Sequence, residues 1–431
     1  MKDIVTSFVG SALMQVFTII SGVLLARLLL PTGRGELAAV ILWSTMIAAV
    51  GILGLHEATA FHAAKRSHEP RQILAASFAL GFVLSIVLVP VAYVVINIVF
   101  ADARPEVLEA AVFFIAFIPL NFVGLFIVSL FQGELKIVEW NILRTVAPGA
   151  YALLIIVFYG LGFVSVFAFA VAALLASAST VAVGLVAQYR RGWLGFRCSL
   201  RDLQPAADLL RYGLKVHIGE VAKIVGERLD QLLISVLLAA ADLGLYVVAT
   251  VVSRGVTGVS NIFGVLAFPK IANQPTGEGR ALVFGRYMRA AVLAGVTAAV
   301  ILFWLFPWIL EFFFGRDFLP ATAVGRLLIL ATLASGIKLL FSAALKGYDR
   351  ALLISRAEFV GLALSAVFLA LLLPRYGIIG AAWAAIISQT GTVLYMANSV
   401  RRDLGVGLVS LFRPTMEDVK LVVERLRELR G

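Results

Sequence analysis

Long apolar runs separated by short polar loops fill nearly the whole chain of 431 residues. Most of the runs are as long as the roughly 20 residues that a helix needs to cross the hydrocarbon core of a bilayer. They are continuous rather than alternating, which predicts helices and not the strands of a membrane barrel. The predicted membrane-spanning helices are residues 4–30, 37–55, 74–100, 110–131, 143–162, 164–187, 216–239, 243–268, 290–314, 319–345, 352–373 and 378–400.

The composition decides where these twelve helices can lie. Hydrophobic residues make up 61% of the chain and charged residues only 14%, and the mean hydropathy is +1.00. One soluble core cannot hide this much apolar surface, so lipid has to solvate it, and the predicted fold class is an all-α polytopic membrane protein. The run at 4–30 leads straight into the next one, so we expect it to remain as the first membrane helix rather than be removed as a signal sequence.

Basic residues predict the orientation of the chain. With the amino terminus inside, about 26 Lys and Arg lie in or beside the inner segments, as the positive-inside rule requires. The outer loops contain only Arg34, Arg104, Arg316 and Arg375. Both termini are therefore predicted to be cytoplasmic. The net charge of +11 is explained by loops that face anionic lipid, and it does not indicate a nucleic-acid partner.

The second half of the chain repeats the first. Residues 28–44 align with residues 237–253 at an offset of 209, and both segments place a glycine, Gly35 or Gly244, in an outer turn. Such a duplication predicts parallel repeats with a substrate site between them. The predicted organisation is an N-terminal six-helix lobe at 1–188, a basic cytoplasmic linker at 189–212, a C-terminal six-helix lobe at 213–400 and a cytoplasmic amphipathic tail at 401–431.

Four segments resemble a known family. They are ARLLLPTGRGELAAVILW at 26–43, RLDQLLISVLLAAADLGLYVVA at 228–249, FGRDFLPA at 314–321 and GIIGAAWAAIISQ at 377–389. Together they are similar to the flippases of O-antigen and other polysaccharide units, in the multidrug/oligosaccharidyl-lipid/polysaccharide exporter (MOP) superfamily, which also holds lipid II flippases and multidrug exporters. Twelve helices rather than fourteen argue against the lipid II branch.

The resemblance implies an architecture and a cargo. Two pseudo-symmetric six-helix bundles would surround a central cavity that opens alternately to the two sides of a prokaryotic cytoplasmic (inner) membrane. The cargo would be an undecaprenyl-pyrophosphate-linked oligosaccharide for lipopolysaccharide or another surface polysaccharide. The implied partners are this lipid-linked oligosaccharide and membrane lipids, with glycosyltransferases or a polymerase of the same pathway as further candidates.

The predicted helix at 216–239 carries the most informative charges. Glu220, Lys223, Glu227 and Asp230 recur at spacings of three, four and three, which would put them on one helical face, and Arg228 lies beside them. Charges at membrane depth usually face a bundle interior or water, so this face is a candidate wall of the cavity. The alternative is that Lys223 and Glu227, at i and i+4, pair only to stabilise the lobe.

Three further cations are candidates for the cavity: Arg254, Lys338 and Arg27. Arginine presents a planar fork that suits phosphate oxygens, so Arg254 is the first candidate for the pyrophosphate contact. The alternatives are that Arg254 pairs with Glu227 or Asp230, and that Arg27 extends to the outer headgroups.

Uncharged polar residues add a weaker signal. The first helix carries a polar stripe, which consists of Ser7, Ser11, Gln15 and Thr18. This stripe and Asn261 could line the cavity or pack helices together. Trp43 and Tyr246 could stack on sugar or mark the membrane interface.

The sequence offers no motif for catalysis or for a cofactor. It contains no phosphate-binding glycine loop, no Cys or His spacing typical of a metal site, and one cysteine, Cys198. We therefore expect no catalytic residues, no bound metal and no enzyme activity. Proton or sodium coupling is open, with Glu220, Glu227 and Asp230 as the candidate sites.

The prediction is a flippase of lipid-linked oligosaccharides that works by alternating access. A cation-coupled multidrug exporter of the same superfamily is the first alternative, because an acidic, aromatic cavity would favour a drug and a cationic one favours the flippase. A membrane-embedded polysaccharide polymerase or ligase is disfavoured by the short outer loops.

Overall fold

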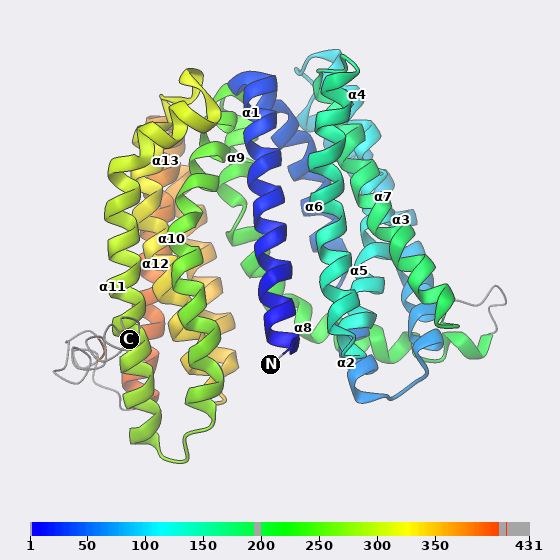
Figure 1. Cartoon of the computed structure of the whole chain (residues 1–431), viewed down its shortest axis with the longest axis vertical. Helices are drawn as coiled ribbons and strands as arrows, with labels where there is room; N and C mark the ends of the chain where they lie inside the picture. The colour runs from blue at the N-terminus through cyan, green and yellow to red at the C-terminus, as the bar shows by residue number, and fades with distance from the viewer. Residues whose placement is uncertain (1, 194–199, 405–410, 412–431) are drawn as a thin grey trace, which may run out of the picture. The chain divides into compact units, whose positions relative to one another are not determined.

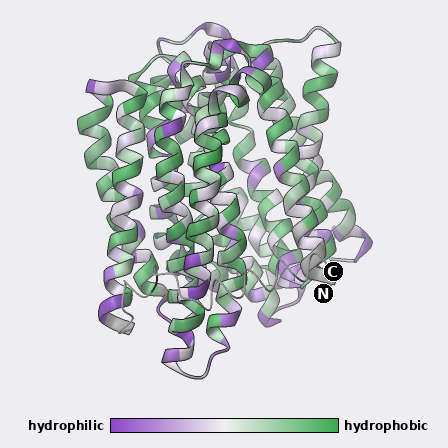
Figure 2. Cartoon of the chain, turned by 60° about the vertical axis from the view of Figure 1, so that its left-hand side comes forward, coloured by the Kyte–Doolittle hydropathy of each residue, from purple (hydrophilic) through white to green (hydrophobic). Residues whose placement is uncertain are grey.

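The computed structural model describes residues 2–193, 200–404 and 411. Within these residues the chain consists of helices and their connections, with no strand, as the apolar runs predict. Nine of the described helical segments are long and apolar enough to cross a membrane. Hydrophobic residues cover most of the helix lengths, and hydrophilic residues gather near the ends (Figure 2). The protein is therefore a multi-pass membrane protein. Cys198 and most of the predicted tail lie outside the described residues.

The chain divides into two compact units. Unit 1 contains residues up to Val248 together with Phe313–Phe318, and unit 2 contains Ala249–Phe312 and the residues from Leu319 onward. The predicted division into lobes at 189–212 stays a prediction.

The helices of unit 1 are shown in blue to green in Figure 1. They are α1 (Lys2–Gly51), α2 (Leu55–Lys65), α3 (Pro70–Val99), α4 (Pro105–Phe114), α5 (Phe117–Gly133), α6 (Ile137–Gly160), α7 (Val166–Arg190), α8 (Ala206–Gly226) and α9 (Leu229–Leu237). Helix α10 (Ala240–Ala272) begins in unit 1 and continues in unit 2. Unit 2 also contains α11 (Gly277–Ile309), α12 (Ala321–Gly347) and α13 (Ala351–Leu404).

Two of the long helices each contain a break. The backbone of α1 leaves helical geometry at Leu30 (φ 57°, ψ 178°), next to Pro31, and that of α13 does so at Gly377 (φ 57°, ψ −142°). Proline lacks an N–H and glycine tolerates positive φ, so both sequences favour an interruption at these points. The first break lies at the last residue of the predicted helix 4–30, next to the predicted connection, and the second lies in the predicted connection between 352–373 and 378–400.

The two glycines of the sequence repeat lie where α1 and α10 meet in unit 1, and each contacts a backbone carbonyl of the other helix. A Cβ atom on Gly35 of α1 would lie 1.7 Å from the carbonyl oxygen of Ala240, and one on Gly244 of α10 would lie 2.0 Å from that of Pro31. The offset of 209 that relates Gly35 to Gly244 also relates Pro31 to Ala240. Each glycine thus contacts the repeat equivalent of the residue that the other glycine contacts, which gives the contact local two-fold character. The backbones of α1 and α10 therefore cross at a pair of positions where only hydrogen fits.

Each unit has its own packed interior. In unit 1, Phe131 and Ile127 of α5 pack with Leu143 of α6. In unit 2, the larger cluster includes Phe284 of α11 and Phe341 of α12, whose rings lie 5.5 Å apart edge to face. Since lipid solvates apolar side chains as well as another helix does, such contacts stabilise helix packing by close fit rather than by burial alone.

Candidate substrate-binding site

The predicted helix at 216–239 is interrupted at its middle. Helix α8 ends at Gly226, Glu227 and Arg228 form a turn, and α9 starts at Leu229. The expectation of one continuous charged face is therefore wrong: Glu220 and Lys223 belong to α8, and Asp230 belongs to the first turn of α9. Gly226 has low helix propensity and is the local signal for this break. Broken helices are the elements with which many transporters form their binding sites.

Hydrogen bonds within the protein orient the polar side chains at the start of α9. The guanidinium of Arg228 donates a hydrogen bond to the Gln231 side chain (Nη1–Oε1 3.1 Å). The Asp230 carboxylate accepts from the Gln231 N–H at 2.7 Å and from the Tyr246 hydroxyl at 2.6 Å. These bonds fix the carboxylate in one orientation, which gives the break a defined polar geometry rather than a flexible charged loop.

The two aromatic candidates, Tyr246 and Trp43, each hydrogen-bond to a residue of α9. Tyr246 is fully buried, so its ring cannot stack on a sugar, and its hydroxyl orients Asp230 instead. Trp43 of α1 is half-buried and donates a hydrogen bond from Nε1 to the Ser235 hydroxyl of α9 at 3.1 Å. Both residues thus attach the broken helix to its neighbours.

The other candidates in unit 1 differ in their surroundings. Lys223 and Glu227 are exposed, and so is Gln15 on α1. Arg27 is exposed as well, and its Nε donates to the backbone carbonyl of Phe313 at 2.7 Å. Glu220 is half-buried, and its Oε1 lies 3.5 Å from Nε2 of His56.

In unit 2, Arg254 and Asn261 are both exposed on α10. Their separation of seven residues puts them on the same face of the helix, two turns apart. In a membrane protein, an exposed arginine and asparagine on one face indicate a surface that contacts water or a polar ligand rather than lipid tails.

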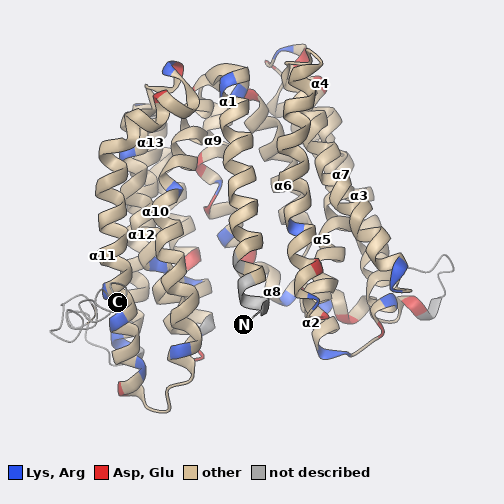
Figure 3. Cartoon of the chain, in the orientation of Figure 1, with Lys and Arg blue, Asp and Glu red and all other residues tan. Residues whose placement is uncertain are grey.

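Lys338 is not a solvated cation. It is 9% exposed, and its Nζ lies 3.2 Å from Oε2 of Glu358 on α13. Sequence reasoning missed Glu358, although an acidic residue inside the apolar run at 352–373 was an available signal. The pair neutralises Lys338, so Arg254 becomes the leading cation of unit 2 for an anionic ligand. Charged residues elsewhere lie mostly toward the helix ends (Figure 3).

The comparisons with known proteins agree on the broad class. A family model described as "Polysaccharide biosynthesis protein" matches residues 1–273. No curated protein sequence matches the chain.

Solved structures of membrane transporters share the fold. A structure described as the lipid II flippase MurJ in an inward closed conformation is 16% identical, with a TM-score of 0.76, and the match covers 94% of this chain and 91% of that one. An inward-facing multidrug resistance MATE family transporter of the MOP superfamily is 14% identical, with a TM-score of 0.70, covering 91% and 94%. A MOP superfamily transporter from Pyrococcus furiosus, whose binding pocket is described as having reverse polarity, is 16% identical with a TM-score of 0.59, covering 93% and 94%. At these identities the likeness shows a common fold, and the fold is that of MOP superfamily transporters.

Proposed function

The chain belongs to the polysaccharide biosynthesis protein family, and from this premise we propose that it is a flippase that moves undecaprenyl-pyrophosphate-linked oligosaccharides across a prokaryotic cytoplasmic membrane. The family match carries the proposal, because it connects a chain with a transporter fold to polysaccharide synthesis. The fold supports movement of a substrate rather than a reaction on it, so the chain is proposed to have no enzyme activity.

The cargo sets the physical requirements. A pyrophosphate and a sugar are strongly disfavoured in the hydrocarbon core, so a polar path has to replace their water. The polyprenyl tail has no such cost and can stay in the bilayer. The protein must therefore supply a hydrated surface with some positive charge and enough hydrogen-bonding groups for sugar hydroxyls.

Arg254 is the proposed pyrophosphate contact. Its exposure on α10 leaves the guanidinium accessible, and its planar fork can donate two parallel hydrogen bonds to phosphate oxygens. Asn261, on the same helical face, is proposed to hydrogen-bond the sugar. Lys223, Arg228, Gln15 and Arg27 are proposed to contribute from unit 1.

The broken helix α8–α9 is proposed to be the element that couples binding to movement. Its turn at Glu227–Arg228 can change angle without breaking a regular helix, while Asp230 stays fixed by Gln231 and Tyr246. Transport would proceed by alternating access between two six-helix lobes, with both termini on the cytoplasmic side. Proton or sodium coupling would act on Glu220, Glu227 or Asp230.

The role of Arg254 can be tested with Arg254→Ala in proteoliposomes that contain a fluorescent undecaprenyl-pyrophosphate oligosaccharide. We expect the initial translocation rate to fall at least about tenfold, since loss of a charge-assisted hydrogen bond costs about 1.5–3 kcal/mol. Arg254→Lys should recover part of the rate. Arg401→Ala, which removes an exposed arginine at the end of α13, is the matched control and should keep the wild-type rate.

Equal rates for Arg254→Ala and the control would remove Arg254 from the site without contradicting the flippase. Efflux of lipophilic cations driven by a proton or sodium gradient, with no translocation of the oligosaccharide, would instead identify a multidrug exporter.

A further inference from the structure

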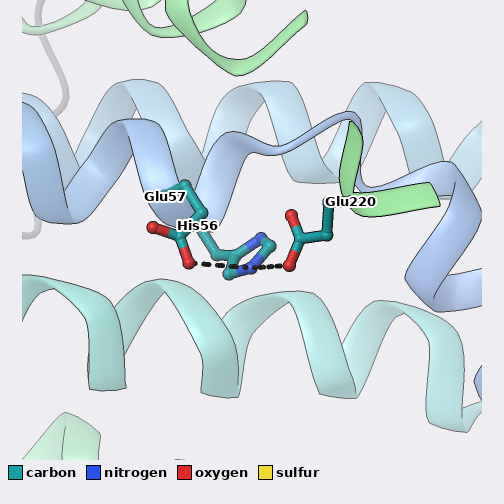
Figure 4. Close-up of side chains that lie close together, drawn as sticks. All are labelled: His56, Glu57 and Glu220. Atoms are coloured by element: carbon teal, nitrogen blue, oxygen red, sulfur yellow. Dashed lines mark ion pairs between the residues drawn. The ribbon is translucent and has the colours of Figure 1, made fainter. Parts of the chain in front are cut away.

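Three side chains of unit 1 converge at the contact between α2 and α8. His56 and Glu57 lie in the first turn of α2, and Glu220 lies on α8 (Figure 4). The His56 Nε2 atom is 3.7 Å from Oε1 of Glu57 and 3.5 Å from Oε1 of Glu220. All three ligand atoms lie within 4.8 Å of one another. In Figure 4 the imidazole stands between the two carboxylates.

We propose that His56, Glu57 and Glu220 bind a first-row divalent metal ion of the Zn²⁺ type. Glu220 is also a candidate coupling residue of the proposed flippase, but the metal proposal does not rest on that role: it stands on the geometry of the three side chains and on their charge.

The distances fit ligands that share an ion better than they fit hydrogen bonds. Hydrogen bonds from a ring nitrogen to a carboxylate are about 2.7–2.9 Å long, which is well below both separations from His56. Nitrogen and oxygen ligands at about 2.0–2.2 Å from a tetrahedral zinc ion lie about 3.4 Å from each other. The two carboxylates thus face the imidazole at nearly the separation that a bridging ion imposes.

The charge balance also favours a cation. Glu57 and Glu220 bring two negative charges close together on either side of the His56 ring. Lys223 is one turn away from Glu220 on α8, but its side chain is exposed. A divalent ion between the carboxylates would cancel their repulsion, and the half-buried position of Glu220 strengthens this effect relative to open solvent.

A tight backbone contact positions the ligands. Gly54, the N-cap of α2, has φ +68°, and a Cβ atom there would lie 2.4 Å from the carbonyl oxygen of Gly213 on α8. His56 and Glu57 come two and three residues after Gly54, and Glu220 lies two turns after Gly213. His217, between them on α8, donates from Nε2 to the Val50 carbonyl at 2.8 Å. The frame therefore fixes the backbone segments that carry the three ligands before an ion binds, which lowers the cost of bringing them together.

The ligand set selects the kind of metal. One imidazole with two carboxylates suits Zn²⁺ and related ions, whereas Mg²⁺ and Ca²⁺ prefer oxygen ligands only. Three protein ligands leave one position of a tetrahedral ion for water. An ion bound here would link α2 to α8, the helix that leads to the break at Glu227–Arg228, and would stabilise that contact.

The test is Zn²⁺ titration of the purified full-length protein in detergent, followed by calorimetry, with Co²⁺ absorption to report an imidazole ligand. We expect one saturable ion per chain that excess Mg²⁺ does not displace. Glu220→Gln, Glu57→Gln and His56→Ala should each weaken binding at least about tenfold, as loss of even an outer partner of a metal site does. Glu57 is largely exposed, so its variant should fold even if the others do not.

The matched control is His68→Gln, because His68, in the loop after α2, faces Asp208 in the first turn of α8 at 3.6 Å and forms a second histidine–carboxylate pair outside the proposed site. It should bind Zn²⁺ with wild-type affinity. The proposal is overturned if the wild type shows no saturable Zn²⁺ binding, if the Glu57 and Glu220 variants bind as tightly as the wild type, or if only His68→Gln loses affinity. The assay needs no transport, so its outcome is independent of the flippase proposal.

Discussion

The α1–α10 contact in unit 1 and the α12–α13 contact in unit 2 hold helices together by opposite means. The first depends on side chains that are absent, since Gly35 and Gly244 let two backbones meet. The second contains a buried ion pair, Lys338 with Glu358. In lipid, apolar surface alone gives helices little preference for one partner, so either steric fit or polar pairing has to supply it. The difference predicts which substitutions destabilise each contact and by how much.

The largest loss should follow from Lys338→Met. The substitution leaves the Glu358 carboxylate buried without its cation, which costs about 3–5 kcal/mol. Thermal unfolding in detergent should show a large fall in the midpoint. The double variant Lys338→Met with Glu358→Leu removes both charges and should recover most of the loss. A single variant as stable as the wild type would mean that the pair is not buried in the folded protein.

Gly35→Ala tests the steric contact. Its Cβ atom would meet the Ala240 carbonyl, and a backbone atom cannot move aside as a side chain can. We expect a loss of about 3 kcal/mol, near the upper end of the range for overpacking, and a similar loss for Gly244→Ala. Gly160→Ala, where nothing lies within 4 Å of the added atom, is the control and should be neutral or slightly stabilising. Similar midpoints for the three variants would contradict the close crossing of α1 and α10.

A smaller effect is expected from Tyr246→Phe. This change removes the hydroxyl that donates to the Asp230 carboxylate and adds no bulk. Loss of a hydrogen bond to a charged group costs about 2 kcal/mol. The measurement is again the unfolding midpoint, and Asp230→Asn should make the Tyr246 change less costly, because the two residues act through one bond. Additive losses in the double variant would show that they do not.

The smallest effect should come from Trp43→Phe, which removes the bond to the Ser235 hydroxyl and some ring area. We expect about 1 kcal/mol, because the bond is between neutral groups and Ser235 keeps its own bond to the Leu232 carbonyl. A loss as large as that of Lys338→Met would show that α9 depends on α1 more than its hydrogen bonds suggest.

The helices were predictable because continuous apolar runs leave few alternatives in a membrane. The breaks at Leu30 and Gly377 were predictable too, since short polar loops marked them. The repeat alignment that pairs Gly35 with Gly244 also pairs the residues each glycine contacts, although the alignment itself could not show that they touch.

The candidate site was less accessible to sequence reasoning. Gly226 is a local signal for the break after it, but one glycine does not by itself end a helix, and the spacing of Glu220, Lys223, Glu227 and Asp230 also fits an unbroken one. Glu358 was visible as an acidic residue inside an apolar run, but the sequence could not show its pairing with Lys338, which is on another helix. The cluster at His56 combines adjacent residues with Glu220, which is far along the chain, so no local spacing could indicate it. The role of the predicted site residues stays a prediction.

Translocation itself tests the central claim most directly. Proteoliposomes with a fluorescent undecaprenyl-pyrophosphate oligosaccharide in both leaflets would be treated with a membrane-impermeant quencher, beside liposomes without protein. The account predicts that the protein exposes the inner-leaflet label to the quencher at a rate well above that of empty liposomes. An equal rate in both preparations, with protein that is folded and inserted, would contradict the claim that this chain moves lipid-linked oligosaccharides.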